Sequence, residues 1–370
     1  MKISVLKETS KGENRVAATP DSIKRLLSKF KNIEFLVEKS AGEKSGFLDA
    51  DYKAVGAKIS TPSKAYEADV VLKVNAPSSA EAKKIKAKSL LLGFLNPAEN
   101  SKLFKEFAKQ KINAISVEKI PRISRAQSMD GLSSQANIGG YRAVLEAGQH
   151  LNRFFPIMMT AAGTSKPAKT IILGVGVAGL QAIATAKRLG ASVEAFDVRP
   201  EVKEQVESLG AKFIEIDLGE DGSGEGGYAK ELSAEAKKKQ QDALQEILKK
   251  ADVVITTALI PGRPAPVLLT EDTVKGMKKG SVIVDMAAAN GGNCPLTEKD
   301  KVIEKHGVIL VGHTNYPSFM AQDSSNFYAR NLLNLLTLLI EEKDGKASIN
   351  YNMEDEIIAG SLVAFEGEVK

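Results

Sequence analysis

Three glycines in the segment GVGVAG, Gly174, Gly176 and Gly179, lie between a β-rich run at 170–173 and a helical stretch at 178–189. In this arrangement the first glycine permits a tight turn, the second lets the backbone approach a pyrophosphate, and the third allows close helix packing. The helix N-terminus then offers free N–H groups and a partial positive charge to the phosphates. The pattern predicts a dinucleotide site, and the alternative is a tight turn without a ligand.

An acidic residue follows at the position where a dinucleotide site needs one. Asp197 ends the next β-rich run, 18 residues after Gly179. A carboxylate there accepts hydrogen bonds from the adenosine ribose and repels the additional phosphate of NADP, so we expect NAD rather than NADP. Arg199 is the opposing signal, because a nearby Arg accommodates that phosphate.

A third polar feature is the segment PRISRAQSMD, residues 121–130, which holds two Arg, one Gln, one Asp and two Ser. Composition alone is compatible with a surface loop that joins two domains. Such a density of donors and acceptors is equally suited to holding a polar ligand.

Short β-rich runs alternate with helical stretches on both sides of this segment. The expected strands are 3–6, 34–37, 70–74, 89–92, 113–117, 170–173, 192–196, 212–216, 253–257, 281–286 and 308–311. The expected helices begin at Pro20, with Thr19 as the cap, and include 80–86, 101–110, 135–151, 178–189 and 326–340. This alternation is typical of parallel sheets covered by helices on both faces.

The chain of 370 residues is long enough for two domains. We expect an α/β fold with two Rossmann-like doubly wound domains and a cleft between them. The first comprises residues 1–134 plus about 320–370, and the second, with the glycine motif, comprises residues 135–319. The insert DLGEDGSGEGG, residues 217–227, cannot bury much apolar surface and predicts a mobile loop ending at Tyr228.

Composition excludes several other classes. The formal net charge is +5 and the charges are spread along the chain, which gives nucleic-acid binding little support. The single Cys294 excludes an internal disulfide, and the three His lack metal-site spacing. The apolar segment 331–340 is half the length of a membrane span, and the N-terminus lacks the apolar core of a signal peptide. We therefore expect no direct membrane span.

Taken with these features, the motifs PRISRAQSMD, GVGVAGLQAIATAKRLG, ESLGAKF, GGYAKE, TTALIPGRPAP and GGNCPL carry a family resemblance. The chain resembles the NAD(H)-binding domain I, in its separate alpha-1 subunit form, of bacterial proton-translocating nicotinamide nucleotide transhydrogenase. This domain belongs to the alanine dehydrogenase/transhydrogenase family. The resemblance extends from Lys7 and Glu8 to the C-terminal region.

The resemblance implies a role for individual residues. Those expected near the site of hydride transfer are Arg122, Gln127, Asp130, Ser133 and Tyr228. Those expected to contact the nucleotide are Arg122, Ile123, Ser124, Arg125, Gln127, Asp130, Ser133, Gly174, Gly176, Val177, Ala178, Gly179, Asp197, Val198, Arg199, Gly227, Tyr228, Gln240, Ala258 and Leu259. Tyr228 would close over bound nucleotide with the Gly-rich insert.

The resemblance also implies an activity and partners. Domain I binds NAD(H), and hydride passes directly to or from NADP(H) on a partner subunit, coupled to proton movement through membrane subunits. The expected partners are the alpha-2 and beta subunits and a second copy of this chain. The protein would be cytoplasmic, held through its partners at the cytoplasmic face of the bacterial inner membrane.

Two alternatives to this function stay open on the sequence. The first half also resembles alanine dehydrogenase, whose substrate-binding Arg and Lys match Arg15 and Lys73. That enzyme has a His in the segment where Phe94 or Leu95 stands here, and a Phe cannot transfer a proton. Arg15 and Lys73 are therefore expected to be structural. The other alternative is a module that binds NAD for regulation without hydride transfer.

Overall fold

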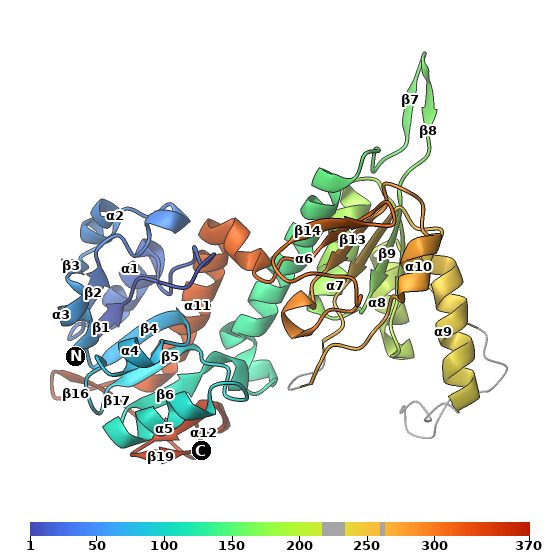
Figure 1. Cartoon of the computed structure of the whole chain (residues 1–370). Coiled ribbons are helices and arrows are strands. Elements are labelled where there is room, and N and C mark those ends of the chain that lie inside the picture. Colours follow the sequence, from blue (N-terminus) through green and yellow to red (C-terminus); the bar gives the residue numbers. More distant parts are fainter. Residues whose placement is uncertain (217–233, 260–262) are drawn as a thin grey trace. The chain divides into compact units, whose positions relative to one another are not determined.

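The computed structural model describes residues 1–216, 234–259 and 263–370. The chain forms two compact units (Figure 1). The first comprises Met1–Gln135 and Pro317–Lys370, and the second comprises Ala136–Tyr316. Gly227 and Tyr228, two of the predicted site residues, lie outside the described residues.

The first unit is built on an eight-stranded sheet in the order β19-β18-β6-β5-β4-β1-β2-β3. Strands β1 to β6 are parallel, and β18 and β19 extend one edge in antiparallel fashion. The bounds are β1 Lys2–Val5, β2 Glu34–Glu38, β3 Lys58–Ser60, β4 Val70–Asn75, β5 Leu90–Phe94, β6 Asn113–Ser116, β18 Leu362–Phe365 and β19 Glu368–Val369.

Helices cover both faces of this sheet (Figure 1). They are α1 Pro20–Lys29, α2 Asp49–Ala54, α3 Pro62–Tyr66, α4 Ser79–Ala82, α5 Ser101–Gln110, α11 Ala321–Leu339 and α12 Glu356–Ser361, and β16 Ile340–Lys343 pairs with β17 Lys346–Ile349. Side chains alternate between two cores along each strand. In β4, Leu72 packs with α1 and α11, whereas Val71 packs with α3 and α5. This alternation of period two made the strands predictable.

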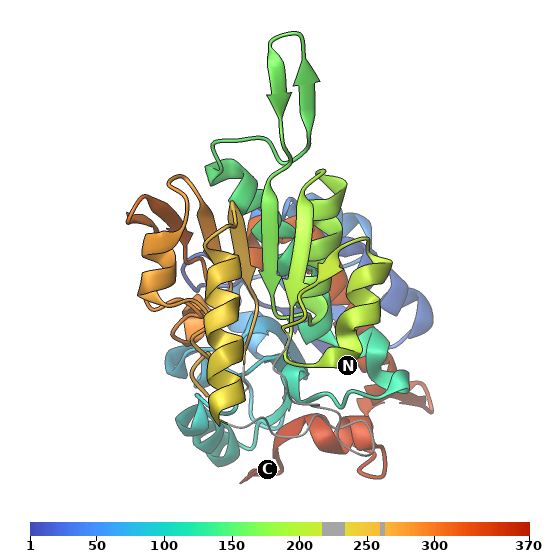
Figure 2. The ribbon, with the colours of Figure 1, turned by 90° about the vertical axis from the view of Figure 1, so that its right-hand side faces the viewer.

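The second unit contains a seven-stranded sheet in the order β11-β10-β9-β12-β13-β15-β14 (Figure 2). All neighbours are parallel except β14, which pairs antiparallel with β15. The bounds are β9 Lys169–Leu173, β10 Ser192–Phe196, β11 Lys212–Phe213, β12 Val253–Thr256, β13 Val282–Asp285, β14 Val302–Lys305 and β15 Val308–Val311. The strand order reverses between β9 and β12, and doubly wound sheets bind ligands at that point, outside the carboxyl ends of the strands.

The helices of this unit are α6 Gly131–His150, which begins before the boundary between the units, α7 Val177–Arg188, α8 Lys203–Ser208, α9 Ala234–Leu248 and α10 Glu271–Gly276. One face of the sheet packs against α6 and α7, and the other packs against α9 and α10. A separate hairpin, β7 Met158–Thr160 with β8 Gly163–Ser165, projects from the unit (Figure 2). No helix in the described part of the chain has the length and apolarity of a membrane span.

The predicted α/β class with two doubly wound units is confirmed. The strands 192–196 and 308–311 and the helix 101–110 have the predicted bounds. The helix expected at 80–86 is shorter: α4 ends at Ala82, and Lys84 and Ile85 continue in tighter turns onto Glu81 and Ala82. The sequence did not predict β3, β14, β16 to β19 or the projecting hairpin, because their exposed residues carry little apolar alternation.

Candidate nucleotide-binding site

The glycine turn follows β9 at the reversal point of the second sheet. Gly174 has φ +94, in the left-handed region. A Cβ on Gly179 would lie 1.9 Å from the carbonyl oxygen of Gly174. Gly174 and Gly179 are thus required by the backbone and by packing. Gly176 differs, because a Cβ there would meet no atom within 4 Å among the described residues. Its missing side chain leaves open space, as a site for close approach of a ligand requires.

The start of α7 is the second component of the site. Its N-cap is Gly176, so no cap side chain accepts a hydrogen bond from the first N–H groups of the helix. The helix has 12 residues, and its partial positive charge lies at this end. Val177 is exposed, whereas Ala178 is in close backbone contact with α6, since a Cβ on Gly140 would lie 2.1 Å from the Ala178 carbonyl oxygen. The helix start can therefore bind an anion.

Asp197 lies directly after β10 and is bound to the glycine turn. Its Oδ2 accepts the Val175 N–H at 2.7 Å, and Arg199 donates to both carboxylate oxygens. Burial alone would raise the pKa of Asp197, but the hydrogen bonds from Arg199 and Val175 outweigh it and lower the pKa. The carboxylate is thus charged at neutral pH at the place where an adenosine ribose would bind.

Exposed apolar side chains surround these polar groups. Val177 is 41% exposed, Val198 73% and Leu259 52%, although all three follow or begin elements at the carboxyl end of the sheet. Ala258 is held because Asn293 donates to its carbonyl oxygen at 2.9 Å and to that of Pro266 at 2.8 Å. The exposed side chains offer apolar surface to the flat rings of a ligand.

The polar segment 121–130 belongs to the first unit and has two kinds of residue. Arg122 and Gln127 are exposed, as is Ser124, whereas Ile123 packs against the core. Arg125 is engaged in a bidentate ion pair with Asp355, with both N–O distances 2.8 Å. The loop is fixed further by Asn331 and Asn334 of α11, which donate to the Ser128 carbonyl oxygen at 2.9 and 3.0 Å. Arg122 and Gln127 are thus presented on a fixed loop.

Asp130 and Ser133 form the N-terminal cap of α6. Oδ1 of Asp130 accepts the Ser133 N–H at 2.9 Å, and Oδ2 accepts the Ser133 hydroxyl at 2.6 Å. The predicted residues therefore form two groups, one on this loop of the first unit and one around the glycine turn of the second. Gln240 lies apart on α9, and no hydrogen bond among the described residues joins it to the glycine turn.

Comparison with known proteins decides the family. The model of the alanine dehydrogenase/PNT N-terminal domain matches residues 4–139, and that of the C-terminal domain matches residues 143–370. The chain belongs to the alanine dehydrogenase/PNT family. The resemblance predicted from the sequence is confirmed, and the chain is an oxidoreductase of this family.

Both transhydrogenases and alanine dehydrogenases of this family resemble the chain. It is 50% identical to the separately encoded first portion of NAD(P) transhydrogenase subunit alpha of Rhodospirillum rubrum, over 100% of this chain and 97% of the relative. It is 32% identical to alanine dehydrogenase 1 of Staphylococcus aureus, over 100% and 94%. The crystal structure of transhydrogenase from Sinorhizobium meliloti superposes with a TM-score of 0.86 at 40% identity, covering 100% of this chain and 98% of that one.

A buried charged cluster lies at the reversal point of the first unit, between β1 and β4. Arg15 donates to both oxygens of Glu13, at 2.7 to 2.8 Å, and to Gln135 at 2.8 Å. Lys73 is 1% exposed, 3.6 Å from Glu8 and 3.4 Å from Glu81. Both cations predicted to be structural are thus paired within the protein.

The carboxylates of this cluster differ in their pKa. Burial raises the pKa of Glu8 despite the charge of Lys73. Burial would also raise the pKa of Glu13, but the hydrogen bonds and charge of Arg15, with a hydrogen bond from Asn75, lower it to about 2. Glu13 therefore stays ionised and neutralises Arg15.

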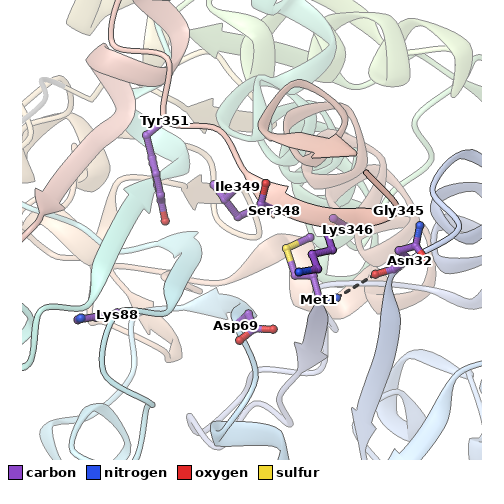
Figure 3. Close-up of a pocket in the computed structure, with 10 residues that line it drawn as sticks. Met1, Asn32, Asp69, Lys88, Gly345, Lys346, Ser348, Ile349 and Tyr351 are labelled. Carbon is purple, nitrogen blue, oxygen red and sulfur yellow. Dashed lines mark hydrogen bonds between the residues drawn. The ribbon is translucent and has the colours of Figure 1, made fainter. Parts of the chain in front are cut away.

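A groove of about 560 Å³ lies elsewhere in the first unit (Figure 3). Met1, Asp69 and Lys88 line it at the amino ends of the strands, facing the residues Lys346 to Ile349 of β17. Asp69 is already bound to the Lys2 N–H and the Lys86 ammonium. Because doubly wound sheets bind cofactors at the opposite, carboxyl ends of their strands, this groove is not the nucleotide site.

Proposed function

We propose that this chain is the NAD(H)-binding component of a proton-translocating transhydrogenase. Hydride passes directly between NAD(H) on this chain and NADP(H) on a partner subunit, coupled to proton movement through membrane subunits. The observation that carries the proposal is the arrangement at the β9–β12 reversal point, with open space at Gly176, an uncapped α7 and an ionised Asp197. The full-length likeness to a transhydrogenase alpha subunit supports it.

The residues of the second unit fit a dinucleotide. Gly174, Gly176 and the first N–H groups of α7 would hold the pyrophosphate, and Asp197 would accept from the adenosine ribose. Val177, Val198 and Leu259 would cover the rings. Gly227 and Tyr228 stay predicted contacts outside the described residues.

The polar loop would bind the reactive end of the nucleotide. A bound nicotinamide supplies the hydride chemistry, so the protein needs no nucleophile and no proton donor to substrate. Its contribution is to orient the ring and exclude water. Arg122 and Gln127 are exposed on a loop fixed by Asn331 and Asn334, which suits them to bind the carboxamide and ribose. Asp130 and Ser133 would complete this clamp.

Alanine dehydrogenase activity is the second candidate, and the first unit does not support it. Phe94 stacks on Tyr328 with ring centroids 5.0 Å apart, so the position that would need a proton-transferring group holds an apolar ring. Leu95 is fully buried. Arg15 is saturated by Glu13 and Gln135, which leaves it no donor pair for a substrate carboxylate.

The partners belong to the same proposal. The alpha-2 and beta subunits would supply the membrane part and the NADP(H) site, and the chain would lie at the cytoplasmic face of the inner membrane. A second copy of the chain would pack on the β7–β8 hairpin, where Ile157 is 53% and Met159 is 73% exposed. An isolated two-stranded hairpin is marginally stable in water, so packing against another surface would stabilise it.

One experiment separates the candidates. The chain is mixed with an NADP(H)-binding transhydrogenase domain, and reduction of an NAD analogue by NADPH is followed by absorbance. Turnover that requires both components supports the proposal. Binding of NADH without any transfer supports a regulatory module instead, and oxidation of NADH with pyruvate and ammonium by the chain alone supports alanine dehydrogenase.

A further inference from the structure

The carboxylate of Asp197 has no free acceptor site in this structure. Oδ1 accepts the Arg199 backbone N–H at 2.9 Å and Arg199 Nε at 3.0 Å. Oδ2 accepts the Val175 N–H at 2.7 Å and Arg199 Nη2 at 3.0 Å. A carboxylate has about four lone-pair sites, so four donors saturate it. A ribose hydroxyl can donate to Asp197 only after the guanidinium of Arg199 leaves.

The two kinds of donor differ in how easily they leave. The Val175 and Arg199 N–H groups belong to the backbone and fix the carboxylate. The guanidinium is on a side chain that is 51% exposed, and it also donates a longer hydrogen bond, 3.3 Å from Nη2 to the Val175 carbonyl oxygen. An ion pair with a half-exposed Arg is screened by solvent, so the ribose diol can replace the guanidinium at small cost.

The same guanidinium is a potential phosphate receptor. Nε and Nη2 form the planar edge that binds phosphate with two hydrogen bonds, and an Arg near this strand end accommodates the 2′-phosphate of NADP in related folds. Here that edge faces Asp197. A 2′-phosphate therefore meets a carboxylate, and the Arg that would bind it is engaged by that carboxylate.

We propose that Arg199 is a specificity-determining residue that Asp197 holds away from the 2′-phosphate. Asp197 then excludes NADP(H) in two ways, by repelling the phosphate and by occupying its receptor. The inference rests on the proposed binding of NAD(H) at this site. It differs from simple repulsion in one consequence: once Asp197 is neutral, affinity for a 2′-phosphate depends on Arg199.

The test measures binding of 5′-AMP and 2′,5′-ADP to the full chain by isothermal titration calorimetry. Both probes lack the nicotinamide half, so residues 121–130 do not enter the result. The proteins are wild type, Asp197→Asn and the double variant Asp197→Asn with Arg199→Gln. We expect Asp197→Asn to bind 2′,5′-ADP about tenfold or more tightly than the double variant does, the effect of one charge-assisted hydrogen bond.

Equal affinity of the single and double variants for 2′,5′-ADP would overturn the inference, because repulsion alone would then explain the specificity. Arg199→Gln alone should still reject 2′,5′-ADP, and acceptance would also overturn it. Thermal unfolding checks each variant. If Asp197→Asn does not fold, Asp197→Ser with and without Arg199→Gln gives the same comparison. Failure of the wild type to bind both NADH and 5′-AMP would instead contradict the proposed function.

Discussion

At the scale of single residues, the glycines of one motif have separable roles. Gly179 has no room for a side chain, because its Cβ would lie 1.9 Å from the Gly174 carbonyl oxygen, whereas a Cβ on Gly176 would meet open space. We expect Gly179→Ala to destabilise the protein by roughly 1–3 kcal/mol through overpacking. Gly176→Ala should fold with wild-type stability but bind NADH at least about tenfold more weakly, since the methyl group would occupy the approach of the pyrophosphate.

These glycine variants are compared by urea unfolding and by titration of nicotinamide fluorescence, which the absence of Trp makes easy to read. Wild-type NADH affinity in a folded Gly176→Ala protein would contradict the assignment of the pyrophosphate site. Wild-type stability of Gly179→Ala would show that the turn relaxes without cost.

A second residue-scale prediction concerns Glu13, whose folded pKa is about 2 against an ordinary value of 4.5. A carboxylate with a lowered folded pKa stabilises the protein above its unfolded pKa. This stability, roughly 3 kcal/mol from the size of the shift, should be lost as the pH falls from about 4.5 to about 2. Glu13→Gln should remove most of that pH dependence and lower stability at pH 7, since it leaves the buried Arg15 charge without its partner.

Asp21→Asn is the matched control for Glu13, because its ion pair with Arg25 is on the surface, with side chains 62% and 54% exposed. Such a pair contributes about 0.2–1 kcal/mol at most. Urea unfolding of all three proteins between pH 2 and pH 7 measures the difference. Parallel stability curves for wild type and Glu13→Gln below pH 4.5 would contradict the prediction.

At the scale of elements, Asp130 joins the polar loop to a helix of 20 residues. Its carboxylate caps α6 through the Ser133 N–H and hydroxyl. We expect Asp130→Ala to lower the free energy of unfolding by about 1 kcal/mol, whereas Asp130→Asn, which keeps an acceptor for the N–H, should lose only a few tenths. Urea midpoints of the two variants give the measurement, and equal losses would show that the charge, not the cap, stabilises the helix start.

Elements also show where prediction from sequence succeeded. Strands buried on both faces, such as β9, β10 and β12, form continuous apolar runs and were found within a residue or two. Gly174 and Asp197 were found because their roles depend on spacing along the chain. The Arg125–Asp355 pair and the Asn293 bond to Ala258 join residues 230 and 35 positions apart. No local pattern encodes such contacts, so the sequence did not distinguish Arg125 from the exposed Arg122.

At the scale of the whole molecule, the β7–β8 hairpin carries the proposed second copy. Its strands pair only with each other, and Met159 is 73% exposed at its outer part. A stable homodimer buries about 800 Å² on each partner, and an arm of this kind adds apolar surface to such an interface. We expect Met159→Asp to shift the chain from dimer to monomer, because the interface would have to bury an unpaired charge.

Met353→Asp is the control for the hairpin variant. Met353 is also exposed, at 45%, but belongs to the first unit and lies outside the hairpin. Sedimentation equilibrium should give twice the chain mass for wild type and Met353→Asp, and a lower, concentration-dependent mass for Met159→Asp. Because the glycine turn, α7 and Asp197 lie within one chain, the monomer should still bind NADH. A Met159→Asp protein that stays fully dimeric would place the contact between copies on another surface.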